Sequence, residues 1–422
     1  MRPDNDAPPA LPDDPVIATG TPLGPELVAG LAPDVGFAVW QVLRTLRLWT
    51  AEPERRREAM FDPAYMDAWE RALLTGSLEP DVRFPLAVIV GEMAAYPAGE
   101  GRLSWACVCV ADWALGHGAV RAGLAFAEAA AQASPLQARY AWLAGRLLRT
   151  HGEGRAAERW LRRAYRLAVS QKDGETQARS LTALGNLSMQ RGSYPSARAL
   201  HSRALRVSRR WHLREQEGMA LHDLFAMALR DNHRADAEQY ARGAFEAYRS
   251  TPFRIPRLAH DLAYWWMEHG YYSRALRIFT AVRSHLPGDD QLRVVANLAR
   301  TYAALGNREE YESLAAEARS VMQGLETLEI PASALLEMAY GAVALEDWSE
   351  AGVLIEEAVQ VARGRDQFDV LLTAEALSDA VARRDMAPIS PARADSRAGT
   401  SEQLANDMVE LLGGDLTRLA QA

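Results

Sequence analysis

Apolar residues in the middle of this chain recur every three or four positions, which is the period of an α-helix with one buried face. The pattern is clearest over residues 178–208, where Leu181 and Leu184 lie on one face before a break at Gly192. A second helical pattern follows and includes Ala204. Short side chains let antiparallel helices approach closely, and a glycine supplies a tight turn. This stretch therefore predicts a helical hairpin.

The same pattern recurs along the chain with separations of 35, 40, 40, 38, 36 and 40 residues. The residue that opens the second helix of each unit is small in all but one case: Ala122, Ala157, Ala197, Ala237, Ala275, Tyr311 and Ala351. Another small residue follows seven positions later in each unit, except that Val282 replaces it in the fifth. Seven positions are two helical turns, so both residues lie on one face. The predicted hairpins are Leu103–Ala133, Ala138–Ser170, Ala178–Arg209, Gly218–Arg249, Pro256–Leu286, Leu292–Gln323 and Ala332–Arg363.

The order of key residues, L-G-x-x…G-x-Y-x-x-A…A, resembles the tetratricopeptide repeat (TPR) family in a long-period bacterial form. The turn signature is repeated, as Gly192-Ser-Tyr, Gly270-Tyr-Tyr, Gly306-Asn-Arg and, less closely, Glu346-Asp-Trp. The resemblance implies an all-α fold: a right-handed α-solenoid of helix-turn-helix repeats with helical N- and C-terminal caps. Such units stack because none can bury its apolar face alone.

The segments outside the repeats follow other patterns. Eight prolines among residues 1–34 predict a disordered tail. The next segment is helical, with an apolar stripe of Phe37, Trp40, Leu43, Leu46 and Leu48, a helix beginning at Pro53 and another at Asp62-Pro63. Its very apolar stretch 84–93 favours a buried helix, although Val88-Ile-Val90 leaves a strand open. A solenoid needs atypical ends, so this segment is interpreted as a cap, with a distinct effector or partner-binding domain as the alternative.

The predicted organisation is a tail over 1–34, an N-terminal helical cap over 35–100, seven TPR-like hairpins over 101–366, a C-terminal capping helix over 367–385, a linker over 386–400 and an amphipathic helix over 401–422. The last helix either folds back on the array or fills a groove in another molecule.

Composition is that of a globular protein, with 49% hydrophobic residues and a net charge of −8. Arginine supplies 46 of the 47 basic residues, which a high-GC genome explains without a special function. The N-terminus shows no secretory signal, and no long apolar run predicts a membrane span. Cys107 and Cys109 are too few for a metal site and are expected to be reduced, so the predicted location is the cytoplasm.

No arrangement of residues predicts catalysis. The single lysine, Lys172, follows no phosphate-binding glycine loop, and the sequence contains neither H-E-x-x-H nor G-x-S-x-G. The nine histidines are scattered and fall mostly at turns or packing positions, as His117, His201 and His269 do. We therefore expect a protein that is not an enzyme and holds no metal or cofactor.

The resemblance implies that the first helices line a concave groove for a peptide. The family positions that face such a groove carry Arg139, Trp142, Arg146, Arg149, Arg179, Asn186, His222, Arg257, His260, Tyr264, Arg293 and Arg300. From Arg139 to Arg214 the sequence has 17 Lys or Arg and four Asp or Glu, a local charge of +13. Such a field attracts acidic partners, so we expect a scaffold or adaptor that binds a protein or peptide with an acidic segment.

Three alternatives remain. In the first, the arginines, including Arg162, Arg163 and Arg166 on second helices, are solvated and bind no partner. In the second, the chain is a regulatory peptide-sensing subunit for a separately encoded effector in signalling, transcription or defence. Nucleic-acid binding is disfavoured by the net charge and the lack of a reader motif. A clamp for a C-terminal carboxylate is also disfavoured, because Trp142 and Met219 stand where the family has basic residues.

Overall fold

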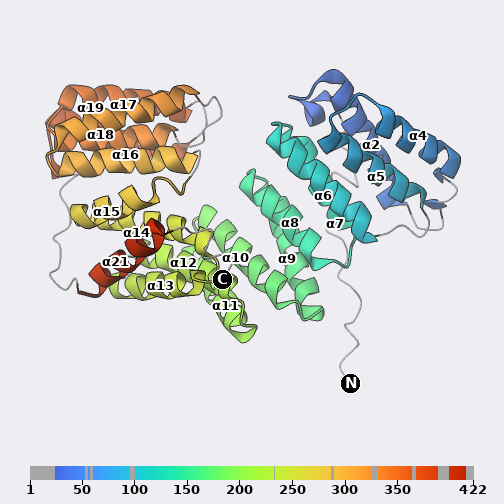
Figure 1. The fold of residues 1–422 in the computed structure, drawn as a ribbon, viewed down its shortest axis with the longest axis horizontal. Coiled ribbons are helices and arrows are strands. Elements are labelled where there is room, and N and C mark those ends of the chain that lie inside the picture. Colours follow the sequence, from blue (N-terminus) through green and yellow to red (C-terminus); the bar gives the residue numbers. More distant parts are fainter. Residues whose placement is uncertain are drawn as a thin grey trace. The chain divides into compact units, whose positions relative to one another are not determined.

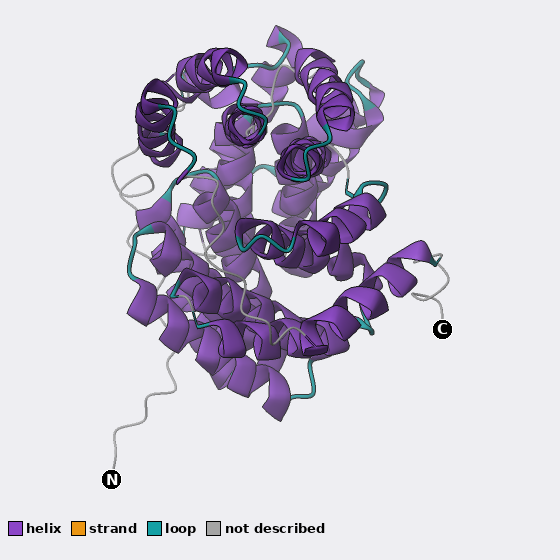
Figure 2. Cartoon of the chain, turned by 90° about the vertical axis from the view of Figure 1, so that its left-hand side faces the viewer, coloured by secondary structure: helices purple, strands orange, loops and turns teal. Residues whose placement is uncertain are grey.

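The computed structural model describes residues 24–52, 56–57, 60–95, 100–231, 233–286, 289–324, 331–363, 367–387 and 399–414. The regular structure in these residues is helical, and none of them forms a strand (Figure 2). The chain divides into two compact units, 1–220 and 221–422, and the division falls inside the helix α12, Arg214–Arg230.

The first unit contains three of the predicted hairpins, α6 with α7, α8 with α9 and α10 with α11 (Figure 1). The second helix α9 also packs extensively on α10, which joins consecutive hairpins. Before them, α4 packs on α5 and α5 on α6. The helices of this unit are η1 (Pro25–Val28), α2 (Pro33–Ala51), α4 (Pro63–Thr75), α5 (Pro80–Ala94), α6 (Glu100–Gly116), α7 (Val120–Ala133), α8 (Ala138–Thr150), α9 (Gly154–Ser170), α10 (Gly174–Gln190) and α11 (Tyr194–Arg210).

In the second unit the stacking changes along the chain. The helices pair as α14 with α15, α16 with α17 and α18 with α19, but α16 also packs extensively on α18, so two first helices lie directly side by side. The helices are α13 (Arg234–Tyr248), η2 (Pro252–Arg254), α14 (Ile255–Glu268), α15 (Tyr272–Val282), α16 (Asp289–Ala304), α17 (Arg308–Gly324), α18 (Pro331–Ala344), α19 (Trp348–Arg363), α20 (Phe368–Arg383) and α21 (Gly399–Gly413). The helix α13 follows α12 along the chain, and the bounds of these helices lie within a few residues of those predicted.

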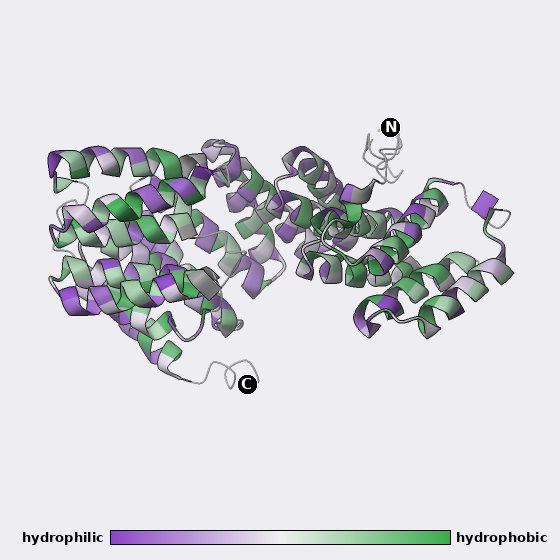
Figure 3. Ribbon diagram, turned by 90° about the horizontal axis from the view of Figure 1, so that it is seen from above, coloured by the Kyte–Doolittle hydropathy of each residue, from purple (hydrophilic) through white to green (hydrophobic). Residues whose placement is uncertain are grey.

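The small residues predicted to open the second helices are buried. Their exposed fractions are 0% for the six alanines and 4% for Tyr311. A glycine from the first helix faces this seam in two hairpins: a Cβ added to Gly145 would lie 2.7 Å from Leu161 Cγ, and one added to Gly185 would lie 2.5 Å from His201 Cε1. Green and purple segments alternate along many helices in Figure 3, as expected where one face is buried and the other meets water.

The turns inside the hairpins share one geometry. Gly192 and Gly306 have φ of +72° and +78°, in the left-handed region that favours glycine. The amide after each glycine donates back to the helix, from Ser193 to the Ser188 carbonyl at 2.8 Å and from Asn307 at 3.0 Å. This is a Schellman ending, which satisfies carbonyls at the helix terminus. The predicted turns are therefore confirmed at these positions.

The N-terminal region departs from prediction in two places. The tail predicted over residues 1–34 extends too far along the chain, because η1 places Leu27 in the core at 8% exposure and α2 begins at Pro33. Residues 1–23 lie outside the described part. The predicted stripe on α2 is also partly wrong. Phe37 and Leu48 are 60% and 48% exposed, while Trp49 and the valines one turn apart take the buried face.

Other features of this region follow the sequence. Asp62 caps α4, its Oδ1 accepting a hydrogen bond from the Ala64 amide at 3.0 Å. The stretch Val88-Ile-Val90 is helical rather than a strand, and it lies buried within α5. The helix expected to begin at Pro53 falls partly outside the described residues.

The C-terminal segments have two roles in packing. The helix α20 packs on α19 and α18, and α21 packs on α15 and α14 of the same chain. The C-terminal helix therefore folds back on the array. Most of the predicted linker, 388–398, and the end of the predicted last helix, 415–422, lie outside the described residues.

Within the described ranges, no helix combines the length and apolar character needed to cross a bilayer.

The buried seam gives a direct test of the repeat register. Ala204 is 0% exposed and packs with Leu181 and Ala220. Ala204→Asp places an unpaired charge there, so we expect the free energy of unfolding to fall by on the order of 3 kcal/mol or more, measured by urea denaturation. Ala199→Asp, on an exposed position of the same helix, is the control and should change it little. Equal effects of the two substitutions would contradict the register.

Candidate functional site

The first helices of the second unit line a polar cavity of about 290 Å³. Residues one helical turn apart on α14, α16 and α18 face it, because positions three or four apart share a helix face. Its lining is His260, Asp261, Tyr264, Arg293, Asn297, Ser333, Ala334 and Glu337. Three of the predicted groove residues, His260, Tyr264 and Arg293, are thus brought together.

A carboxylate with two histidine partners forms one wall. His222 Nε2 lies 3.0 Å from Asp261 Oδ2, and His260 Nδ1 lies 3.0 Å from Oδ1 of the same carboxylate. Burial raises the pKa of the Asp261 carboxyl, but the hydrogen bonds from His222 and His260 outweigh it and hold this pKa well below its usual range. The carboxylate is therefore ionised at neutral pH. On the far side of His260, Asn297 Nδ2 lies 3.1 Å from its Nε2.

Behind the lining residue Glu337 lies an ion-pair network around Arg300. Its Nη1 lies 2.7 Å from Glu337 Oε2 and 2.6 Å from Glu268 Oε1, and its guanidinium lies 4.4 Å from the centre of the Tyr340 ring. Burial lowers the pKa of Arg300, but the charges of the two glutamates raise it above its ordinary value. Arg300 was predicted to face a groove; its side chain is 9% exposed, and it ties α14, α16 and α18 together.

Tyr264 connects this network to the cavity. Its hydroxyl donates to Glu337 Oε1 at 3.0 Å. The charge of Glu337, together with burial, raises the pKa of Tyr264 well above its ordinary value, so the phenol stays protonated. Sequence reasoning missed both Asp261 and Glu337. A signal existed for Glu337, which is the one charged residue in the α18 sequence PASALLEMAYGAVA.

The remaining predicted residue of this unit, Arg257, pairs with Asp290. It is exposed and does not line the cavity.

The first unit has a different cluster, centred on an indole. The guanidinium of Arg146 lies 5.4 Å from the centre of the Trp142 ring, and that of Arg179, from the next first helix, lies 5.1 Å from it. Trp142 is half-buried. Burial and the nearby Arg179 lower the pKa of Arg146, while the charge of Asp112 acts in the opposite direction. Two predicted groove arginines and the predicted tryptophan therefore lie together, and we call them the Trp142 cluster.

The other predicted residues of the first unit lie outside this cluster. Arg139 packs 4.5 Å from the Tyr140 ring centre and donates to its hydroxyl. Arg149 and Asn186 are half-buried on α8 and α10.

The positive charge of the stretch 139–214 is partly neutralised by its own carboxylates. Glu158 pairs with Arg162 and Arg191, Glu175 pairs with Arg179, and Glu217 pairs with the arginines at 209 and 214. Arg163 was expected to be solvated in one reading, but it is 2% exposed and donates to the Pro135 carbonyl at 2.6 Å. The local field is thus weaker than the count of charges suggests.

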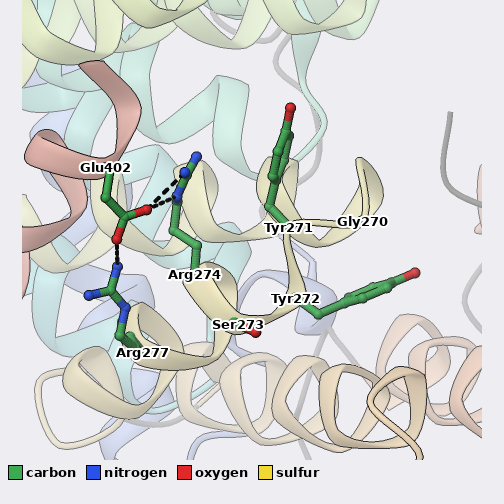
Figure 4. Close-up of a pocket in the computed structure, with 7 residues that line it drawn as sticks. All are labelled: Gly270, Tyr271, Tyr272, Ser273, Arg274, Arg277 and Glu402. Atoms are coloured by element: carbon green, nitrogen blue, oxygen red, sulfur yellow. Dashed lines mark hydrogen bonds and ion pairs between the residues drawn. The ribbon is translucent and has the colours of Figure 1, made fainter. Parts of the chain in front are cut away.

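A second cavity, of about 400 Å³, marks the docking place of the C-terminal helix (Figure 4). Glu402 of α21 reaches between Arg274 and Arg277 of α15, with 2.8 Å from its Oε2 to Arg274 Nη2. Arg277 also donates to Asn406 Oδ1 at 2.9 Å, and His285 Nε2 lies 2.9 Å from the Leu412 carbonyl. These contacts orient α21 along its length.

Among the described residues, no group of three or more His, Cys, Asp or Glu side chains is placed to hold a metal ion.

Comparisons with known proteins add structural likenesses of low similarity. No protein-family model matches the chain, and no curated protein matches it. BtubC (BKLC) from P. vanneervenii is 18% identical with a TM-score of 0.42, over 50% of this chain and 92% of that one. The P58(IPK) TPR domain is 16% identical with a TM-score of 0.22, over 75% and 98%. A circular tandem repeat protein with novel repeat topology and enhanced subunit contact surfaces is 14% identical with a TM-score of 0.18, over 91% and 92%.

The chain's own hairpins, seams and turns define its class. It is an all-α protein built of TPR-like helical repeats.

Docking of α21 depends on the Glu402 carboxylate. Burial raises the pKa of Glu402, but hydrogen bonds and charges of Arg274 and Arg277 outweigh it, and this pKa lies below its ordinary value. The stabilisation that the Glu402 carboxylate contributes is therefore full above the ordinary glutamate pKa of about 4.3. It is lost as the pH falls through the lowered pKa that Glu402 has in the folded protein. Because Glu402 is 45% exposed, we expect Glu402→Gln to lower the free energy of unfolding by about 1 kcal/mol near pH 7, measured by urea denaturation.

Glu410→Gln, at an exposed position of the same helix, is the control and should have no such effect. A Glu402→Gln difference that persists undiminished in acid would show that the arginines are not its cause.

Proposed function

We propose that this protein is a non-enzymatic scaffold that binds a protein or peptide through its first helices, and that the Trp142 cluster receives an acidic segment of that partner. The observation that carries the proposal is the half-buried indole of Trp142 with the guanidiniums of Arg146 and Arg179 at 5.4 and 5.1 Å from its ring centre. Tryptophan and arginine are the residues most often found where binding energy concentrates in interfaces.

The chemistry of the cluster suits an acidic, partly apolar segment. The indole offers apolar area, and the two guanidiniums offer donors to carboxylates. Arg146 comes from α8 and Arg179 from the neighbouring helix α10, and packing fixes the positions of both helices. Binding to such a surface needs no cofactor and has a low ordering cost, because the helices are preformed. Arg179 also pairs with Glu175 at 2.6 Å, so a partner carboxylate at this arginine competes with Glu175.

We also propose that residues 35–100 act as an N-terminal cap for the repeats. The helix α5 packs on α6, and α2 packs on α7 and α5, so these helices cover the first hairpin. This arrangement supplies the atypical end that a repeat array needs.

The test uses fluorescein-labelled eight-residue peptides, one rich in Glu and Asp with a central Leu, and one of the same design with Lys and Arg. Full-length protein should bind the acidic peptide, with an affinity that falls as salt rises from about 50 to about 300 mM. Arg146→Glu combined with Arg179→Glu should weaken that binding by about tenfold or more, because attraction becomes repulsion. Fluorescence anisotropy gives both results.

The matched control is Arg155→Glu combined with Arg166→Glu, which makes the same change of charge at exposed positions on the second helix α9. This control variant should keep most of the wild-type affinity for the acidic peptide. Equal affinity for the two peptides, or equal losses in the two double variants, would overturn the proposed surface.

A further inference from the structure

The C-terminal helix α21 covers a face of α15 and α14 that belongs to the repeats, although α21 itself follows the repeats in the chain. Beside its buried stripe, Glu402 reaches the two arginines of α15 (Figure 4). The stripe is apolar, and its members are at most 3% exposed: Leu404, Ala405, Met408 and Leu412. This face of the repeats therefore receives an acidic amphipathic helix, and α21 shows which chemistry it recognises.

The two arginines of this face obtain their carboxylate partner from outside the repeats. Arg274 and Arg277 both pair with Glu402, and no other carboxylate among the described residues forms an ion pair with either of them. Elsewhere in this unit an arginine pairs within the repeats, as Arg319 of α17 does with Glu350 of α19. The face of α15 is thus complementary in charge to an added acidic helix.

Arg274 is well placed to recognise a carboxylate. With α21 in place its side chain is 10% exposed, and its guanidinium lies 5.2 Å from the centre of the Trp266 ring and 5.1 Å from that of the Tyr271 ring. Removal of the partner of a buried cation is costly, because the charge is then uncompensated. Tryptophan, tyrosine and arginine are also the residues that concentrate binding energy at interfaces. The α14–α15 hairpin therefore presents a site that favours a carboxylate occupant.

The helix α21 does not fill the face that it covers. A cavity of about 400 Å³ remains beside the ion pair, and Glu402 is the one described residue of α21 in its lining (Figure 4). Well-packed interfaces reach the density of protein interiors, so this volume indicates an imperfect fit. The side chain of Glu402 is 45% exposed, and water weakens an ion pair of such exposure. Both features favour displacement of α21 by a better ligand.

We propose that this face of α15 and α14 is a binding surface for an acidic amphipathic helix of a partner protein, and that α21 is its competitor within the same chain. The partner helix places a carboxylate at Arg274 and Arg277, and apolar side chains at positions four residues apart, as in α21. A segment of the same chain competes at a high effective concentration, on the order of mM for short linkers. The inference concerns the second unit and does not depend on the Trp142 cluster.

The test uses the full chain and a fluorescein-labelled peptide with the sequence of residues 399–414. Leu404→Asp combined with Met408→Asp, made in the protein and not in the peptide, places charges in the buried stripe and detaches α21. By fluorescence anisotropy, this detached variant should bind the peptide at least about tenfold more tightly than the wild type, in which α21 competes. The same peptide with Glu402→Lys should bind the detached variant at least about tenfold more weakly.

Two results of this titration would overturn the proposal. One is that the detached variant binds the peptide no better than the wild type. The other is that the detached variant binds both peptides equally well.

Arginine variants locate the binding on α15. In the detached variant, Arg277→Glu should weaken binding of the unchanged peptide by about tenfold or more, and the peptide with Glu402→Lys should then bind more tightly than the unchanged one. The matched control is Arg308→Glu on α17, because Arg308 is 49% exposed and Arg277 is 44% exposed. It should alter the affinity by less than about threefold. Equal losses in the two variants would place the peptide elsewhere.

Hydrogen exchange on the wild type shows whether α21 leaves its place without global unfolding, and it applies even if the detached variant fails to fold. The α21 amides should exchange at least about tenfold faster than the α18 amides, and Glu402→Gln should speed them about fivefold without affecting α18. Exchange of α21 at the rate of α18 would overturn the proposal.

Light scattering distinguishes a partner protein from a second copy of this chain. We expect the wild type to remain monomeric over about a hundredfold range of concentration. A dimer that is abolished by Leu404→Asp with Met408→Asp would assign the occupant to α21 of a second copy, and would overturn the proposal of a different partner.

Discussion

Close approach of the two helices in each hairpin is the constraint on which the rest of this structure depends. The seam between α10 and α11 leaves no room for even a methyl group at Gly185, because the buried ring of His201 fills that space. Alanines two turns apart on the second helix complete the seam. Packing of this density transmits any change of side-chain volume to its neighbours. The recurrence of short side chains is thus what makes each hairpin a rigid unit that can stack on the next.

Rigid hairpins explain how polar groups can be held on the first helices. In the second unit, Asp261, Asn297 and Glu337 come from three different helices, yet all three residues line a single cavity. Buried polar groups are tolerated when their partners are fixed, as the histidines fix Asp261 and Arg300 fixes Glu337. The Asn297 oxygen, which accepts no hydrogen bond from the described residues, is the exception within this network. In the first unit the same rigidity brings Arg146 of α8 and Arg179 of α10 close to the Trp142 ring.

The fold could be predicted because its signal is local and repeated. A small residue such as Ala197 reappears at a nearly constant interval, and the helix bounds follow from that interval. The candidate sites were harder to predict from the sequence, because periodicity places Arg300 on a first helix but does not reveal that Glu268 and Glu337 neutralise it. Those partners lie 32 residues before it and 37 after it in the chain. The misplaced Phe37 has a similar cause, since no repeat template applies to α2 and its neighbours decide which face is buried.

A double-mutant cycle at the seam of α10 and α11 tests the central claim most directly. Urea denaturation of the wild type, Gly185→Ala, His201→Ala and the double variant gives the coupling free energy between the two positions. We predict that Gly185→Ala costs about 1–3 kcal/mol when His201 is present, because the added methyl group overlaps the ring, and that the cost vanishes or changes sign in the His201→Ala background, where alanine favours the helix. A Gly185→Ala effect that is the same in both backgrounds would contradict the account.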